Sequence, residues 1–237
     1  MTATITRFVD DITGDLLENY GVDLLKALEA ENEFEVNANV VNWLLDEVPG
    51  LMGQVNGTTR DALRASLVEG AALNEDVAEL VARVTGIFAA AQETRAPIIG
   101  DTFATKIMGF TTQEAARQAG FEKKRWLSSQ DQVVRGSHEA LNGQTVNRED
   151  KFQSPSGAAA MHPGAFGVAS EDIGCRCAMR PVPEGEKAAN MTDKQFRAFT
   201  EKQHIKTSRK IAQTFNEVLK EQKGLVLKRL RVVLETP

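Results

Sequence analysis

The chain of 237 residues is long enough to bury a hydrophobic core without disulfides, and it could form one large domain or two small ones. Its composition, 42% apolar and 26% charged, is typical of a soluble globular protein, and no apolar run reaches the ~18 residues of a membrane span. The net charge of -5 divides into 6 basic and 17 acidic side chains over residues 1–100, and 12 basic and 5 acidic over residues 187–237. This asymmetry indicates different surroundings for the two ends, or solvated helix faces of opposite sign.

Residues 1–120 show apolar spacing typical of helices. One stripe ends at Pro49-Gly50, which predicts the end of a helix there, and Thr58 or Thr59 is an expected start for the next. Asn74 is an expected cap for a further helix, and Pro97 suits the first turn of a fourth, with a break near Thr111. No strand alternation occurs in this region, so we expect a helical N-terminal half. Its first residues hold no basic segment followed by an apolar stretch, so we expect no signal peptide and a cytoplasmic start.

Residues 121–185 change in character, with many Gly, Pro, Ser and Asn residues between short apolar runs. We expect a strand at 124–128, a short helix at 131–140, a turn at Asn142-Gly143, and a strand at 177–182. Trp126 is expected in the core. Residues 154–174 form a long irregular segment, and loops of that length usually have a function or are held by a stabilising cross-link. The sequence therefore predicts a small mixed α/β module with long loops.

Residues 186–237 return to a helical pattern, and residues 187–237 carry a net charge of +7. Thr192 and Gln195 give a capping-box spacing. Ile211, Phe215 and Val218 begin a narrow apolar stripe, which favours either a partner helix or packing against the chain's own N-terminal helices. The predicted fold is therefore α+β, divided into a helical region at 1–120, a module at 121–185 and a basic C-terminal helix at 186–237.

Candidate metal ligands gather in the module. His138, His162, Cys175 and Cys177 match in type and number the ligands that Zn²⁺ takes, although their spacing is not that of a standard zinc finger. A module with so thin a core would gain stability from a metal ion. Asp131 is an alternative to His162 as fourth ligand. The other interpretation is a pair of half-buried thiols beside an exposed His162. His204, on the terminal helix, is expected at the surface.

Asp131, Arg135 and His138 are spaced to share one face of the expected short helix. They could form a catalytic cluster or an ion pair beside a metal ligand. No nucleotide-binding loop, nucleophile elbow or zinc-protease motif occurs in the chain. An enzyme that uses Arg135 and His138, of the nuclease or ADP-ribosyl transferase kind, is therefore an alternative that lacks a third polar group. A DNA-binding regulator is a second alternative, but no helix-turn-helix pattern is visible.

An ordered series of short motifs resembles the Mu F-like family of bacteriophage minor head proteins. Upstream of it, Thr58-Thr59, Leu63, Gly70, Phe88 and Arg95-Ala96 fit the helical lead-in of that family, so the resemblance covers roughly residues 55–182. The series itself reads Trp126-Leu127-Ser128, Asp131, Val134-Arg135, His138, Leu141-Asn142-Gly143, Phe152, Pro163-Gly164 and Cys175-Arg176-Cys177.

The resemblance implies a structural protein of the phage head rather than an enzyme. Such proteins are present in few copies, associate with the portal vertex and other capsid proteins, and can contact packaged DNA. It therefore implies a location in the virion head, after assembly in the host cytoplasm, with self-association also open. One departure concerns the usual I-A-R-T-E stretch: Asp101 and Phe103 stand here where the family has Arg and Glu. The basic C-terminal helix, outside the matched region, could neutralise DNA phosphates.

Overall fold

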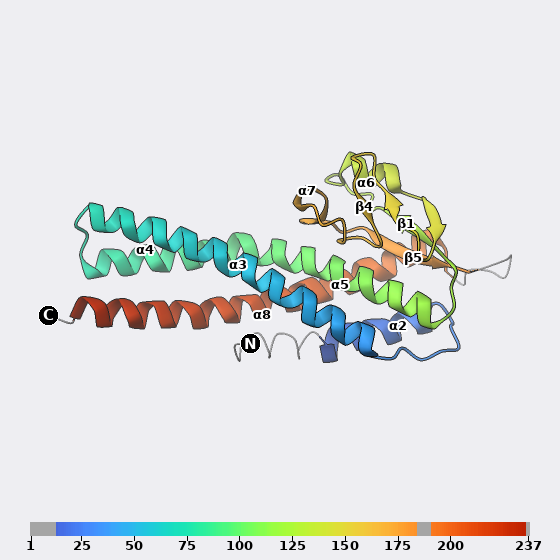
Figure 1. Ribbon diagram of the computed structural model, residues 1–237, viewed down its shortest axis with the longest axis horizontal. Coiled ribbons are helices and arrows are strands. Elements are labelled where there is room, and N and C mark those ends of the chain that lie inside the picture. Colours follow the sequence, from blue (N-terminus) through green and yellow to red (C-terminus); the bar gives the residue numbers. More distant parts are fainter. Residues whose placement is uncertain (1–12, 184–190, 236–237) are drawn as a thin grey trace.

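The protein consists of an elongated helical body with a small antiparallel module on one side (Figure 1). The computed structural model describes residues 13–183 and 191–235. This architecture confirms the predicted α+β class. No helix in these two ranges is long and apolar enough to cross a membrane. The body contains the π-helical turn η1 (Thr13–Glu18) and helices α2 (Asn19–Ala27), α3 (Ala38–Ala72), α4 (Val77–Ala90), α5 (Ala96–Gln118) and α8 (Asp193–Glu235), with a π-helical segment η2 (Ala91–Arg95) between α4 and α5.

Helix α3 is a single helix of 35 residues, where the sequence predicted two. The Asn37 side chain caps its start by accepting hydrogen bonds from the backbone N–H groups of Asn39 and Val40. The predicted stop at Pro49-Gly50 and start at Thr58 or Thr59 are therefore wrong. Val40 and Leu44 before that point are buried in one core cluster, and Leu63 and Leu67 after it pack on another. Packing on both sides outweighs the local preference of Pro and Gly.

The turn from α3 into α4 is closed by a capping box. Asp76 accepts from the backbone N–H of Glu79, and the Glu79 side chain accepts from the backbone N–H of Asp76. The cap is thus two residues later than expected. Asn74 instead occupies the left-handed region with a φ of 53°, which Asn tolerates better than most residues.

Helices α4 and α5 follow one another through η2 without a loop. Pro97 lies at the start of α5, as its missing N–H predicts. The same missing donor disturbs the hydrogen-bond ladder of the preceding turn, where the π-helical segment occurs. The predicted break near Thr111 is wrong: its hydroxyl donates to the Ile107 carbonyl at 2.8 Å and the helix continues to Gln118.

Helix α8 packs lengthwise on α5 and α4, so its apolar stripe is used within the chain (Figure 1). Ile211 is buried against residues of α5, whereas Phe215 and Leu219 join a cluster with Val84 and Phe88 of α4. The helices approach closely at Gly100, where a Cβ atom would lie 2.5 Å from the Ser208 carbonyl oxygen. At its start, Thr192 and Gln195 form the predicted reciprocal cap.

The module is built around a three-stranded antiparallel sheet in the order β2-β1-β5. The central strand β1 (Lys123–Leu127) pairs with β2 (Thr145–Asn147) and β5 (Ala178–Val182), and β1 and β5 lie near the predicted positions 124–128 and 177–182. A second pair, β3 (Phe152–Gln153) and β4 (Ala159–Ala160), was not predicted. The expected helix at 131–140 is only α6 (Gly136–Leu141), and the expected loop contains the short α7 (Ala169–Asp172). Gly143 makes the predicted turn with a φ of 83°.

A buried lysine ties the module to α5. Lys124 of β1 is fully buried, and its ammonium group donates to Gln113 Oε1 at 3.1 Å and to the Met161 carbonyl at 2.7 Å. Burial lowers its pKa to about 8, because the charged form loses hydration. The hydrophobic pattern of the sequence does not predict this buried polar contact.

Candidate functional site

The core of the module surrounds Trp126, which is fully buried. Three rings lie around it, with centroids 5.2 Å away for Phe152, 5.6 Å for His138 and 5.7 Å for Phe166. Both cysteines of the chain belong to this same cluster. The prediction that Trp126 is a core residue is confirmed, and one histidine and two thiols lie beside it in an otherwise apolar environment.

The structure brings together three of the four predicted metal ligands. His138 comes from α6, whereas Cys175 and Cys177 lie in the segment that enters β5. His138 Nδ1 is 3.6 Å from the Cys175 sulfur and 3.5 Å from the Cys177 sulfur. The three side chains are all buried, and their ligand atoms lie within 4.8 Å of one another. We call these three residues the His-Cys-Cys group.

The other nitrogen of the histidine ring faces a buried carboxylate that sequence reasoning missed. Glu171 Oε2 of α7 lies 3.0 Å from His138 Nε2, a contact with the distance of an ion pair but without hydrogen-bond alignment. Ser137 donates to the same oxygen at 2.9 Å. Burial acts to raise the pKa of Glu171, but hydrogen bonds from Ser156 and Ser137, together with His138, leave it below the ordinary value. Only the fold could reveal this pairing, because Glu171 lies in the expected loop.

The two thiols are unequal. Hydrogen bonding to Cys175 lowers the pKa of Cys177 to about 5, with His138 acting in the same direction against the effect of burial. The same contact, with burial, raises the pKa of Cys175. Cys177 is therefore the first of the two thiols to lose its proton. A thiolate in a buried pocket is the form that binds a soft metal ion.

Three side chains fix the backbone on the approach to the cysteines. On α5, the Thr102 hydroxyl accepts from the Gly174 N–H at 2.9 Å, and the Thr105 hydroxyl donates to the Cys175 carbonyl. Arg135 donates to the Ile173 carbonyl. The segment 173–175 is thus anchored from α5 and from the start of α6. The partner of Arg135 is thus a backbone carbonyl of this segment.

The other two candidate ligands lie elsewhere. His162 is buried against α5, with Nδ1 2.9 Å from the Pro163 carbonyl and its ring 6.4 Å from that of Phe110. Burial lowers its pKa to about 4. Asp131 is exposed and pairs with Arg176 at 2.8 Å. The structure therefore does not bring His162 or Asp131 to the His-Cys-Cys group, and the expectation of an exposed His162 is also wrong.

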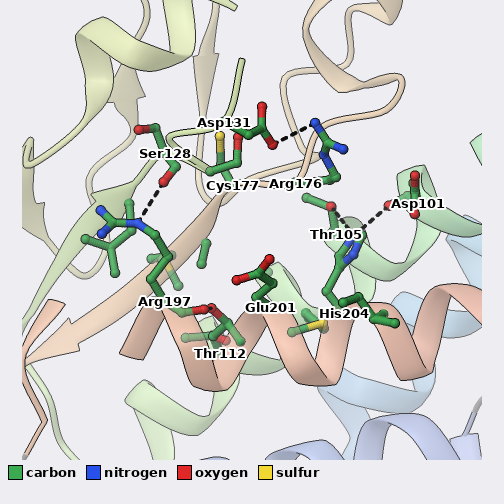
Figure 2. Close-up of a pocket in the computed structure, with 18 of the residues that line it drawn as sticks. Asp101, Thr105, Thr112, Ser128, Asp131, Arg176, Cys177, Arg197, Glu201 and His204 are labelled. Atoms are coloured by element: carbon green, nitrogen blue, oxygen red, sulfur yellow. Dashed lines mark hydrogen bonds and ion pairs between the residues drawn. The ribbon is translucent and has the colours of Figure 1, made fainter. Parts of the chain in front are cut away.

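A cavity of about 280 Å³ adjoins this group between α5, α8 and the sheet (Figure 2). Cys177 lines it, so the cavity reaches one member of the group. Arg197 donates to the Ser128 carbonyl at 2.9 Å on one side, and the Arg176–Asp131 pair lies on another. The carboxylate of Glu201 points into the space between them (Figure 2). The lining combines apolar side chains with polar side chains of both signs of charge.

His204 also lines this cavity, which corrects its expected place at the surface. Its Nε2 lies 3.0 Å from the Thr105 hydroxyl and 3.2 Å from the Asp101 carbonyl, so the residue links α8 to α5 (Figure 2). Burial lowers its pKa. The helical spacing of the sequence could not distinguish an outward face from one that the module covers.

In a comparison with known proteins, residues 57–180 of the chain match the model of the family described as "Phage Mu protein F like protein". The NAD(+)--arginine ADP-ribosyltransferase EFV of Enterococcus faecalis is 35% identical over 107 residues, 44% of this chain and 22% of that protein. The minor head protein GP7 of Bacillus phage SPP1 is 32% identical over 76 residues, 32% of this chain and 24% of that protein. The aligned segments thus span less than a quarter of each relative. No solved structure matches the chain.

Proposed function

Because the chain belongs to the family of Phage Mu protein F like proteins, we propose that it is a minor head protein of a tailed phage that associates with the portal vertex. The observation that carries this proposal is the family match over residues 57–180, more than half of the chain. It agrees with the motif resemblance, and one relative is named a minor head protein.

We propose a structural rather than an enzymatic role, on the grounds of how the candidate catalytic groups are engaged. His138 is only 1% exposed and faces two sulfurs and Glu171, and Arg135 holds a backbone carbonyl. A substrate would have to displace core contacts to reach the imidazole. The two departures from the family pattern also serve packing: Asp101 accepts from Ser208 of α8 at 2.6 Å, and Phe103 is 3% exposed.

The resemblance to an ADP-ribosyltransferase does not require the same activity here. The aligned segment is 22% of that protein, so the rest of its chain has no counterpart in the alignment. An assay of NAD⁺-dependent ADP-ribosylation, run on the purified protein beside its His138→Ala variant, tests this. Turnover by the wild type that the variant lacks would contradict the structural role.

A groove between α5 and α7 supports a protein partner. It measures about 470 Å³ and is lined mainly by apolar side chains, among which Ile98, Val168 and Ile173 are between 44% and 49% exposed. Neighbouring exposed apolar side chains of this kind are typical of protein contact sites. We assign the groove to the portal, because portal association is the partner that the family resemblance implies.

The portal association is tested by co-purification and by head incorporation. Wild-type protein expressed with the portal and capsid proteins of its phage should co-purify with the portal and be found in purified heads. The double variant Ile98→Asp/Val168→Asp should lose both properties without unfolding, because both side chains are already exposed. Leu225→Asp on α8, at a residue 61% exposed, is the matched control and should retain them. Failure of the wild type to enter heads would overturn the proposed function.

Contact with packaged DNA is supported by the distribution of charge on α8. Lys202, Lys206, Arg209 and Lys220 are exposed, and their spacings of four, three and eleven residues return to one face of the helix. Cations arranged along a helix can neutralise successive phosphates and release counterions. We propose that this face, the basic face of α8, contacts DNA without sequence specificity.

The DNA contact is tested by the salt dependence of binding to a duplex of arbitrary sequence. Lys202→Gln/Lys206→Gln should reduce the slope of log K against log salt by about 2, because each phosphate contact contributes about 0.9. The control pair Arg60→Gln/Arg64→Gln changes two exposed cations of α3 and should leave the slope nearly unchanged. Equal slopes for the wild type and the α8 variant would reject the basic face as the DNA contact.

A further inference from the structure

We propose that His138 Nδ1 and the sulfurs of Cys175 and Cys177 bind one Zn²⁺ ion, with Glu171 as the carboxylate that orients the imidazole. The proposal concerns a site that is independent of the role in the phage head. It rests on where three ligand atoms point, on what holds them there, and on what the ion would connect.

The separations within the group fit a tetrahedral ion. Bonds of ~2.3 Å to sulfur and ~2.0–2.1 Å to nitrogen at the tetrahedral angle place the sulfur and nitrogen atoms about 3.6 Å apart. In the structure, His138 Nδ1 lies 3.6 Å from the Cys175 sulfur and 3.5 Å from the Cys177 sulfur. Both sulfurs approach the same ring nitrogen, which is the arrangement that a shared metal ion requires. Two sulfurs and one nitrogen are also a ligand set that binds Zn²⁺ in preference to harder cations.

The surroundings of the histidine are those of a metal ligand. Zinc-bound imidazoles commonly pass their second N–H to a carboxylate, which fixes the tautomer and the orientation of the ring. Glu171 Oε2 lies 3.0 Å from His138 Nε2 on the side of the ring away from the sulfurs. Ser137 holds that carboxylate in turn, at 2.9 Å. The ring is thus held between Glu171 and the cysteines, with Nδ1 directed at the two sulfurs.

The ion would join segments that share little regular structure. It would link α6 directly to the strand entrance at 175–177, and through Glu171 to α7. These points enclose the loop-rich stretch between β2 and β5, whose regular structure is limited to the two-residue strands β3 and β4 and the four-residue helix α7. A metal ion that closes so long a stretch limits the freedom of the unfolded chain as well as fixing the native loop. No fourth His, Cys, Asp or Glu within 13–183 and 191–235 joins the group, so we assign the fourth position to a water molecule.

Metal content of the purified full-length chain is the first test. Protein produced in zinc-supplemented medium and desalted should contain about one zinc per chain by elemental analysis, and Cys175→Ser, Cys177→Ser and His138→Ala should each lose most of it. His162→Gln is the matched control, since it alters a buried histidine of the same module that lies outside the group. It should keep its zinc. Retention of zinc by all three ligand variants, or its loss in His162→Gln alone, would overturn the assignment.

A second test does not depend on whether a variant folds. Wild-type protein depleted of zinc and loaded with Co²⁺ should show thiolate-to-cobalt charge-transfer bands of two-sulfur intensity and the strong visible absorption of tetrahedral coordination. The same sample before loading should contain two reactive thiols upon denaturation. A wild-type protein that binds neither Zn²⁺ nor Co²⁺ with its thiols reduced overturns the proposal. So does mass spectrometry that finds Cys175 and Cys177 joined to each other in protein from a reducing cytoplasm.

The role of Glu171 as a positioning residue has its own readout. Glu171→Gln should weaken zinc affinity about 10–100-fold in competition with a chromophoric chelator, while the two-sulfur charge-transfer bands of the Co²⁺ form persist. Asp172→Asn, at the neighbouring acid that caps backbone N–H groups of Phe166 and Gly167, is the control for general loosening of α7. Equal loss of affinity in the two variants would assign Glu171 to loop structure instead.

Discussion

The helical body and the small module hold together in different ways. In the body, apolar stripes meet along whole helices, as Ile211, Phe215 and Leu219 of α8 do against α5 and α4. In the module, one tryptophan lies at the centre of a thin core, and side chains such as Thr105 and Arg135 hold the loops by their backbone. Stability in the body therefore follows buried area, whereas order in the module depends on a few specific polar contacts.

The two regions meet along α5, where the fit is close. A Cβ atom at Gly109 would lie 2.6 Å from His162 Nδ1, and one at Gly164 would lie 3.0 Å from the Lys106 Cα atom. Gly164 also has a φ of 79°, which requires glycine. The module therefore docks on α5 with close backbone approach at these two glycines.

The largest change in the free energy of unfolding is expected from a substitution in the helical body. Phe215→Ala should lower the free energy of unfolding by about 3–5 kcal/mol, because it removes a fully buried ring from the contact of α8 with α4. Leu225→Ala, at a residue of the same helix that is 61% exposed, should change it by less than about 0.5 kcal/mol. Denaturant unfolding followed by far-ultraviolet circular dichroism measures both. Similar values for the two variants would contradict a body stabilised by this stripe.

Acid should lower the stability of the protein through His162, at the boundary between the two regions. Burial lowers the pKa of His162 from 6.5 to about 4, so between these values the unfolded chain binds a proton that the folded chain excludes. Stability should fall as the pH drops through that window, with about 2–3 kcal/mol from this residue. His162→Gln should unfold with a shallower pH dependence between 6.5 and 4. If its pH profile is parallel to that of the wild type, His162 is not the source.

Removal of the Thr105 hydroxyl should loosen the module more than the distant end of the body. Thr105→Val leaves the Cys175 carbonyl without its donor, at an expected cost of about 1–3 kcal/mol. Backbone amides of 164–177 should exchange hydrogen faster, while those of α4 should not change. The control Thr214→Val removes a hydroxyl that bonds only one turn back along α8, to the Lys210 carbonyl. Comparable exchange in the two variants would mean that Thr105 does not anchor the loop.

The smallest expected change in the free energy of unfolding comes from two glycine substitutions, which distinguish helix propensity from packing. Gly86→Ala on the exposed side of α4 meets nothing within 4 Å and should raise the free energy of unfolding by about 1 kcal/mol. Gly100→Ala should lower it, because the added Cβ would lie 2.5 Å from the Ser208 carbonyl oxygen of α8. Thermal unfolding of both variants beside the wild type checks the opposite signs. Two shifts of the same sign would contradict the close crossing of α5 and α8.

Local chemistry alone determined several elements of this protein. The capping pair Thr192–Gln195, the turn at Asn142-Gly143, the strands around Trp126 and 177–182, and the α+β class were predicted because each depends on neighbouring residues or on a short repeat of polarity. The motif series also predicted the family, which the match over residues 57–180 confirms. Zinc binding by His138, Cys175 and Cys177 stays a prediction, although the three residues do lie together.

Tertiary structure decided what local patterns could not. The stop predicted at Pro49-Gly50 failed because packing on both sides keeps α3 continuous, and the stripe of α8 could equally have faced another chain until the body covered it. The partners of His138 illustrate the same limit: Glu171 is 33 residues away in sequence, yet 3.0 Å away in space, whereas His162 is turned aside against α5. Residue types fix which atoms can bind one another, but only the course of the chain between them fixes which atoms meet.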